Sequence, residues 1–348
     1  MNFGLILTGG NPSPWTAPVP RVYQNFIHQA VLAEELGYDN VWTAEHHGTD
    51  EYFSAQFPML AAIAARTSRI RIGTYIVILP LYNPLQVAEE AATLDAISDG
   101  RFDLGVGQGY VVSEYAAYNI PRKERPARME EGLAIIRGLW EQETFSHDGK
   151  HFKIGPLSLR PRPVQKQLPI WVAGLTEKSI DRAARYGCHF AGAGAATGMQ
   201  VYDASLRRHG HDPQHFYKGA LRMVYIADTR ERAWTEAAPH VHHQMSVYTK
   251  NLDDAGDFKW PGGYFGVDPL PPPERLGAEK NLHFFGAPFI IGSPEDAIKE
   301  IERSHAETGV THLVMWMQIG GMDPRLTEHS MRLFAKEVMP HFRKQRNG

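Results

Sequence analysis

Residues 39–47 have the sequence DNVWTAEHH, in which a short apolar run leads directly into one acid and two imidazoles. Residues 41–44 have the length and composition of a buried strand, so Glu45, His46 and His47 lie at the C-terminal end of that strand. In a barrel of alternating strands and helices, active sites lie at this end of the strands. The stretch therefore predicts where the chemistry lies if the rest of the chain forms such a barrel.

The rest of the chain alternates short apolar runs with amphipathic helical stretches. Strands are expected at residues 3–7, 41–44, 70–77, 102–106, 169–173, 221–226 and 311–317, with weaker signals around Phe190 and Ala220. This alternation over 348 residues predicts an α/β fold, a (β/α)8 TIM barrel with insertions. A doubly wound open sheet is the alternative, but residues 8–12 form a loop and not a glycine-rich phosphate turn that opens a helix.

Two segments interrupt the alternation within what we expect to be a single domain over residues 1–348. Residues 145–168 are rich in proline and contain a predicted hairpin turn at residues 147–150. Residues 251–288 are rich in glycine, proline and aromatic residues, which argues against plain disorder. The second segment is predicted to be a lid or a subunit-packing insertion; its aromatic residues include Phe258, Trp260, Tyr264, Phe265, Phe284 and Phe285.

Composition excludes several classes of function. The formal net charge of -3 and the lack of a long basic run give no electrostatic case for binding nucleic acid or an anionic membrane. No apolar run approaches the roughly 20 residues of a membrane helix. Cys188 is the single cysteine, which excludes an intrachain disulfide, and the chain starts directly with a predicted strand. A cytoplasmic location is therefore expected.

The histidines at residues 240, 242 and 243 form the one cluster that suggests a metal site. Two ligands on one helix face must be three or four residues apart, and His240 and His243 satisfy this spacing. No matching acidic ligands lie close by in sequence. We therefore expect a solvated helix face here and no metal site.

Further motifs follow DNVWTAEHH in order. They are GTYIVILP at residues 73–80 with Asn83-Pro84, DGRFDLGVG at 99–107, PIWVAG at 169–174 and VMP at 338–340. Their order and spacing resemble those of bacterial luciferase and its flavin-dependent relatives, from residue 3 to residue 340. The resemblance implies a TIM barrel that usually binds FMN.

A phosphate site is expected after the strand at residues 169–173. Phosphate binds where backbone N–H groups meet the positive end of a helix. Ala173, Gly174 and Leu175 lead into a helix start that carries the hydroxyls of Thr176 and Ser179. Glu177 must point away from such a phosphate. The alternative is that Thr176 only caps the helix.

By the resemblance, His46 corresponds to the histidine near the reactive edge of the flavin. Oxygen chemistry there requires hydrogen-bond donors and exclusion of water. An imidazole can donate or accept a proton near neutral pH. Glu45 is expected to orient His46 or to face the flavin, and His47 to have a structural role.

The ring of the flavin is expected to lie over residues 74–76. Relatives often have a cis peptide bond at the position of Tyr75-Ile76, and Thr74 belongs to the same segment. Gln108, Tyr110 and Ser113 follow the next strand, where Gln108 and Ser113 could bond the pyrimidine edge. The alternative for these residues is a solvated loop.

Two other features bear on the activity. Bacterial luciferase has arginine in place of Gln108 and glutamate in place of Leu175, which argues against light emission. Trp316 and Met317 end the last predicted strand and either pack in the core or form the wall of an apolar substrate pocket.

The resemblance implies a two-component monooxygenase that uses reduced FMN and O2 on a fairly apolar small organic substrate. A separate NAD(P)H:flavin reductase would supply the reduced flavin, and a homodimer is expected. The main alternative is a deazaflavin-dependent dehydrogenase on the same barrel; Glu45-His46-His47 favours the FMN branch. A metal-dependent hydrolase and a flavin-binding protein without catalysis remain as further alternatives.

Overall fold

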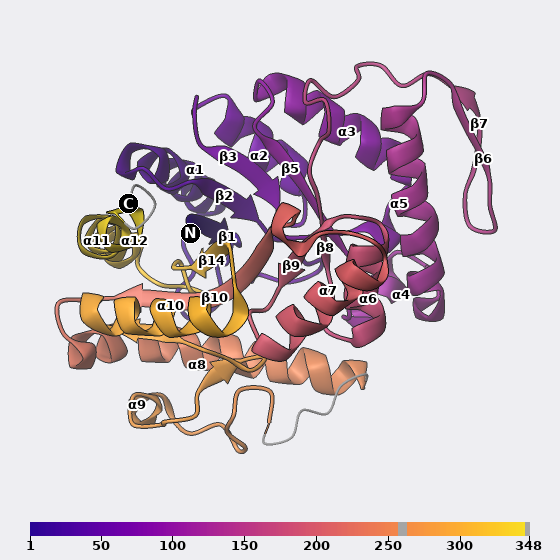
Figure 1. The fold of residues 1–348 in the computed structure, drawn as a ribbon. Helices are drawn as coiled ribbons and strands as arrows, with labels where there is room; N and C mark the ends of the chain where they lie inside the picture. Colours follow the sequence, from indigo (N-terminus) through magenta and orange to yellow (C-terminus); the bar gives the residue numbers. More distant parts are fainter. Residues whose placement is uncertain (257–262, 345–348) are drawn as a thin grey trace.

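The computed structural model describes residues 1–256 and 263–344, so Phe258 and Trp260 lie outside the described residues. Within these ranges, parallel strands form one closed barrel (Figure 1). The strands, in their order around the barrel, are β1 (Asn2–Leu7), β2 (Asn40–Thr43), β3 (Arg71–Thr74), β5 (Phe102–Gly107), β8 (Ile170–Ala173), β9 (His189–Gly192), β10 (Lys218–Ile226) and β14 (His312–Trp316). Pairing of β10 with both β9 and β14 closes the barrel, which confirms the predicted TIM fold.

Helices surround the barrel (Figure 1). They are α1 (Val19–Leu36), α2 (Gln56–Ala64), α3 (Pro84–Ile97), α4 (Val112–Ala117), α5 (Arg125–Glu141), α6 (Glu177–Arg185), α7 (Ala196–Arg208), α8 (Arg230–Ala255), α9 (Pro273–Leu276), α10 (Pro294–Thr308), α11 (Pro324–Leu333) and α12 (Met339–Lys344). A π-helical turn at Phe334–Val338 and 3-10 turns at Leu79–Leu81, Arg122–Glu124 and Pro213–His215 complete the helical segments of the described chain.

Local sequence signals explain several helix ends. Gly37 adopts φ 81° and ends α1, a backbone conformation in which a side chain would be strained. Asn83 caps α3 by accepting a hydrogen bond from the backbone N–H of Leu85. The weak strand signals around Phe190 and Ala220 are also confirmed, because both residues lie in barrel strands.

The predicted strand at residues 70–77 is interrupted. The chain forms β3, then Tyr75-Ile76 with a cis peptide bond, then β4 (Val77–Ile78). β3 pairs with β2 and β5, whereas β4 pairs with β5. The expected cis bond is therefore present, and the break falls at the C-terminal end of the barrel.

Both predicted insertions have regular structure. The first contains the antiparallel hairpin of β6 (Phe145–Asp148) and β7 (Lys153–Leu157), which projects from the barrel beside α5 (Figure 1). The second begins inside α8 and includes α9, the hairpin of β11 (His283–Phe284) and β12 (Ala287–Pro288), and then β13 (Ile290–Gly292). Strand β13 pairs with the C-terminal half of β10, so this insertion lies at the C-terminal end of the barrel.

No helix in residues 1–256 and 263–344 is long and apolar enough to cross a membrane.

Candidate active site

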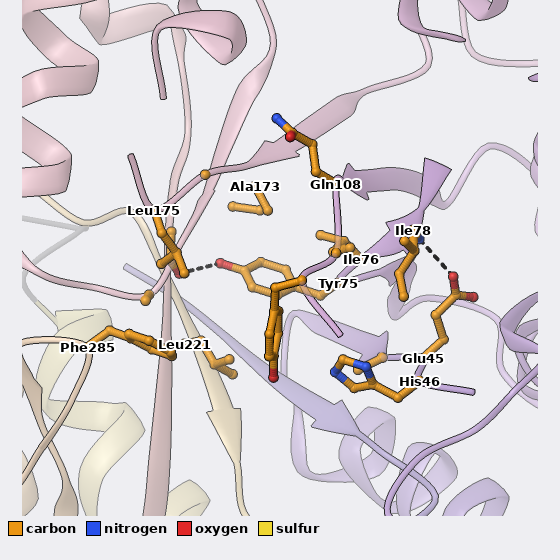
Figure 2. A pocket seen from close by; sticks show the side chains of 18 of the residues that line it. Glu45, His46, Tyr75, Ile76, Ile78, Gln108, Ala173, Leu175, Leu221 and Phe285 are labelled. Atoms are coloured by element: carbon orange, nitrogen blue, oxygen red, sulfur yellow. Dashed lines mark hydrogen bonds between the residues drawn. The ribbon is translucent and has the colours of Figure 1, made fainter. Parts of the chain in front are cut away.

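A cavity with about 1240 Å³ of space, part of it open to solvent, lies at the C-terminal ends of the barrel strands. Side chains at the C-terminal ends of all the barrel strands line it, from Ile6 of β1 to Trp316 of β14. The second insertion adds Phe284 and Phe285 to the wall. The second insertion therefore contributes side chains to the cavity wall. Figure 2 shows part of the lining.

His46 lies in the wall of this cavity, as predicted, with a carboxylate partner that the sequence did not reveal. Its Nδ1 is 2.8 Å from Oε1 of Glu114, which belongs to α4. The Glu114 side chain is fully buried, whereas that of His46 is 14% exposed. A carboxylate at Nδ1 holds the proton on that nitrogen, so Nε2 remains for a ligand in the cavity.

The expectation that Glu45 orients His46 is wrong. One carboxylate oxygen of Glu45 accepts from the backbone N–H of Ile78 at 2.7 Å, and the other accepts from Gln56 and Tyr82 at 3.0 Å and 3.1 Å. Figure 2 shows the carboxylate turned towards Ile78, away from the imidazole of His46. Burial raises the pKa of Glu45 to about 7, although these hydrogen bonds oppose the shift.

Gln56 connects Glu45 to the interrupted strand. Its Nε2 donates to Glu45 and also to the backbone carbonyl of Ile76, at 3.0 Å each. Its Oε1 accepts from Thr43 at 2.9 Å. Glu45 therefore holds the β3–β4 break in place, which is a positioning role that the strand pattern could not indicate.

His47 has the structural surroundings that we expected. Its backbone N–H donates to Glu114 at 2.9 Å, and its ring contacts the hydroxyl of Tyr118 at 3.1 Å. His47 is not among the residues that line this cavity.

The residues of the predicted phosphate site lie together at the start of α6. Ala173, Gly174, Leu175, Thr176 and Ser179 all line the cavity. Thr176 and Ser179 cap the helix reciprocally: Thr176 Oγ1 accepts from the N–H of Ser179 and Ser179 Oγ accepts from the N–H of Thr176. Thr176 therefore caps the helix and also lies at the cavity, where it could contact a phosphate.

Gly174 keeps this site open. A Cβ at this position would lie 2.7 Å from Ser179 Oγ and 2.8 Å from the backbone nitrogen of Ile180. The backbone at the helix start is therefore approachable in a way that other residues would block. Glu177, which had to point away from a phosphate, is exposed and is not part of the cavity lining.

The residues that were expected around the flavin ring divide into two groups. Tyr75, Ile76, Gln108 and Tyr110 line the cavity. The Tyr75 hydroxyl donates to the carbonyl of Gly192 at 2.7 Å, and burial raises its pKa. With its amide oxygen turned towards Arg182, Gln108 accepts a hydrogen bond from Nη2 at 3.1 Å. Arg182 is buried, so a positive charge lies directly beside the Gln108 amide.

Thr74 and Ser113 were predicted to bind the cofactor, and the structure places both elsewhere. The Thr74 hydroxyl donates to the carbonyl of Gly105 and accepts from its N–H, each at 2.8 Å, and so bridges β3 and β5 inside the barrel wall. Ser113 is exposed on α4 and does not line the cavity. Side chains of neighbouring residues along a strand point to opposite sides, so Tyr75 lines the cavity whereas Thr74 does not.

Two further expectations concerned Trp316 with Met317 and the histidines at residues 240–243. Trp316 lines the cavity, whereas Met317 packs in the main core near Tyr38. The expectation of a solvated helix face was wrong for His240, which is buried with Nδ1 3.0 Å from the carbonyl of Gly320. His243 pairs with Glu51 at 2.7 Å. In the described residues there is no group of three or more histidine, cysteine or acidic side chains that could hold a metal ion.

Sequence reasoning missed several residues of the site. Glu114, which lies in α4, carried no motif in the sequence. Tyr52, Tyr248 and Leu221 line the cavity from separate elements, and no local pattern distinguished them. Other lining residues of this kind are Ala191, Gly192, Ala193 and Arg125.

Known proteins resemble the chain over nearly its whole length. The flavin-dependent trigonelline monooxygenase, oxygenase component, of Acinetobacter baylyi is 26% identical over 352 aligned residues, covering 92% of this chain and 90% of that protein. An F420-dependent glucose-6-phosphate dehydrogenase of Kineococcus radiotolerans is 33% identical over 339 residues, covering 90% and 91%. The crystal structure of the monooxygenase RslO1 from Streptomyces bottropensis superposes with a TM-score of 0.84 at 25% identity, covering 98% of this chain and 100% of that one.

All three of these proteins are oxidoreductases by name. The family model described as luciferase-like monooxygenase matches residues 1–312. Because this match spans most of the sequence and agrees with the barrel and its cavity, the chain belongs to the luciferase-like monooxygenase family.

Proposed function

We propose that the protein is the oxygenase of a two-component monooxygenase, which uses reduced FMN and O2 on a fairly apolar small organic substrate. A separate NAD(P)H:flavin reductase would supply the reduced flavin, and the expected homodimer and cytoplasmic location belong to the same proposal. The observation that carries it is the pairing of His46 with buried Glu114 at the wall of a cavity that also contains the open helix start at Gly174.

The residues present fit a flavin phosphate. The N–H groups in the first turn of α6 and the Thr176 hydroxyl can donate to phosphate oxygens, and the helix dipole favours an anion there. The Ser179 hydroxyl instead donates to the backbone carbonyl of Thr176 at 2.8 Å. Tyr75 and Ile76 offer an apolar surface for a flat ring. When bound, a reduced flavin supplies the electrons that activate O2.

The chain's own residues would control protons and water. Nε2 of His46 can donate or accept a proton towards a group in the cavity, because Glu114 fixes the other ring nitrogen. The apolar wall limits the access of water to the enclosed part of the cavity, which strengthens hydrogen bonds made there. Phe284 and Phe285 extend this wall from the second insertion.

A deazaflavin-dependent dehydrogenase is the second candidate. It is supported by the 33% identity to a dehydrogenase named as F420-dependent, which exceeds the 26% identity to the monooxygenase relative. In that case His46 would hold or move a proton during hydride transfer, and O2 would take no part.

Anaerobic titration with reduced FMN, followed by rapid mixing with O2, tests the first proposal. We expect a saturable complex whose reoxidation is slower than that of free reduced FMN, because the cavity limits water and positions a donor. Reoxidation at the free rate, or no binding of FMN together with saturable binding of F420, would favour the dehydrogenase. Flavin binding without any oxygen or hydride chemistry would leave a protein that only binds the cofactor.

A further inference from the structure

Aromatic side chains from separate elements surround the part of the cavity beside His46. We call this group the aromatic box; its members are Tyr52, Tyr110, Tyr248, Phe284, Phe285 and Trp316. Tyr52 follows β2, Tyr110 follows β5 and Tyr248 belongs to α8. Because these elements are far apart in sequence, packing of the whole barrel assembles the box.

Several rings of the box contact one another at steep angles, whereas Tyr110 and Tyr248 are stacked, with centroids 6.4 Å apart and an interplanar angle of 22°. Tyr248 is central, with its ring centroid 5.1 Å from Phe284 at 86° and 6.2 Å from Trp316 at 68°. Phe284 and Phe285 are 4.7 Å apart at 70°. Such edge-to-face contacts build walls that meet at angles, and each wall offers a ring face or edge to a ligand.

His46 forms one wall of the same space. Its ring centroid is 4.5 Å from Tyr52 and 5.7 Å from Tyr110. A ligand in the aromatic box therefore lies next to the imidazole whose Nε2 is turned away from Glu114. Binding in the box and proton transfer at His46 are thus available to one and the same molecule.

The polar atoms of the box favour a ligand with a hydrogen-bond acceptor. Tyr52 donates its hydroxyl hydrogen to the Tyr248 oxygen at 2.8 Å, so Tyr248 keeps its own hydrogen for a further acceptor. The indole N–H of Trp316 donates to the carbonyl of Gln318 at 2.9 Å, so this ring presents carbon to the cavity. One edge of a bound ring would thus meet a hydroxyl donor.

Charge in the cavity argues against a cationic ligand, which aromatic rings can also bind. Glu45 is the acidic residue among the described lining residues, and its carboxylate faces Ile78, Gln56 and Tyr82. Arg125 adds a positive charge to the same lining.

We propose that the aromatic box binds a neutral, planar aromatic substrate carrying a hydroxyl or carbonyl oxygen that accepts from Tyr248. This inference rests on the proposed function and deepens it by naming the substrate class. The ring would stack on or against the box, and its oxygen-bearing edge would lie within reach of Tyr248 and His46.

Calorimetric titration of the full chain with matched probes tests this, both without flavin and with FMN present. The probes are 2-naphthol, naphthalene, decahydro-2-naphthol and N-methylquinolinium. We expect 2-naphthol to bind about tenfold tighter than its saturated analogue, because ring contacts add to simple burial. Equal or tighter binding of decahydro-2-naphthol, or tightest binding of the quinolinium cation, would overturn the proposal.

Variants separate the oxygen contact from the ring contacts. Tyr248→Phe should weaken 2-naphthol binding by about threefold to tenfold, the range for one lost neutral hydrogen bond, and leave naphthalene unchanged. Phe284→Leu should weaken both probes alike. Tyr217→Phe, at the opposite end of the barrel and 48% exposed, is the matched control and should change neither. No discrimination between the probes by Tyr248→Phe would contradict the oxygen contact.

These titrations do not depend on oxygen chemistry. Suppose that reduced FMN binds and is reoxidised slowly, but that the probes bind with similar affinity. The proposed substrate class is then wrong, and the proposed function stands. If 2-naphthol binds more tightly than the other probes but FMN does not bind, the aromatic box binds the proposed ligand class and the monooxygenase proposal fails.

Discussion

At the scale of single residues, His46 and Glu114 form the pair with the clearest chemical meaning. Removing the imidazole with His46→Ala should leave FMN affinity nearly unchanged, because the proposed phosphate site is at the start of α6 and does not include His46. The yield of product per O2 consumed should fall about 100-fold, which is the lower end of the range for loss of a general acid–base catalyst. Parallel measurement of O2 uptake and product checks this.

Glu114→Gln is the informative companion of that variant. The amide keeps the shape of the carboxylate but not its charge, so it holds the imidazole less firmly in one tautomer. We expect a smaller loss of product than for His46→Ala, together with an altered pH dependence. Unchanged product yield in His46→Ala would remove this histidine from the mechanism.

Glu45 gives a prediction on the pH dependence of stability. Burial raises the pKa of its carboxyl from 4.5 to about 7 in the folded state. The folded protein therefore holds this proton more tightly than the unfolded chain does. The resulting stabilisation is complete below pH 4.5 and is lost as the pH rises through about 7, a loss of about 3 kcal/mol in the free energy of unfolding.

Glu45→Gln cannot lose a proton, so its free energy of unfolding should lack this decline. The variant starts less stable, because an amide presents one acceptor oxygen to the donors at Ile78, Gln56 and Tyr82. The difference between wild type and variant should shrink as pH rises from about 5 to about 8 in urea titrations. Parallel pH profiles of the two proteins would show that Glu45 is not the group responsible.

At the scale of elements, the start of α6 combines a helix cap with a proposed phosphate site. Thr176→Val should lose the cap, at a cost of about 1 kcal/mol in stability. It should also lower FMN affinity by about tenfold, the effect of a lost hydrogen bond to a charged group. Riboflavin, which lacks the phosphate, should bind the variant and the wild type with similar affinity in fluorescence titrations.

Thr229 provides a matched control for the cap. It caps α8 by accepting from the N–H of Arg232 at 3.2 Å and does not line the cavity. Thr229→Val should therefore lower stability without changing the ratio of FMN to riboflavin affinity. A similar ratio in Thr176→Val and the wild type would place the phosphate elsewhere.

At the scale of the whole molecule, closure of the barrel depends on close approach between β3 and β5. A Cβ on Gly105 would lie 1.9 Å from the backbone carbonyl oxygen of Thr74. Gly105→Ala should therefore force the strands apart and cost at least about 3 kcal/mol, the upper range for overpacking. Gly155→Ala, in the projecting hairpin with nothing within 4 Å, should be nearly neutral in urea unfolding.

Much of the fold was predictable because its signals are local. Hydrophobic runs of strand length, the helix stop at Gly37 and the cap at Asn83 each depend on residues close in sequence. The same is true of the capping pair Thr176 and Ser179. The boundaries differed mainly at the third strand, where a break at Tyr75-Ile76 cannot be recognised from hydrophobicity.

The candidate site was predictable only in part, because its geometry joins distant segments. Short-range pattern was enough to predict that His46 lies at a strand tip and that residues 174–179 lead into a helix. Three features depend on the folded barrel: Glu114, not Glu45, holds His46, Thr74 points into the barrel wall, and a particular set of rings lines the cavity. These contacts join residues as far apart as Tyr52 and Tyr248, and strand register and helix packing bring them together. No local periodicity encodes such a meeting, because it depends on how the closed barrel orients each loop.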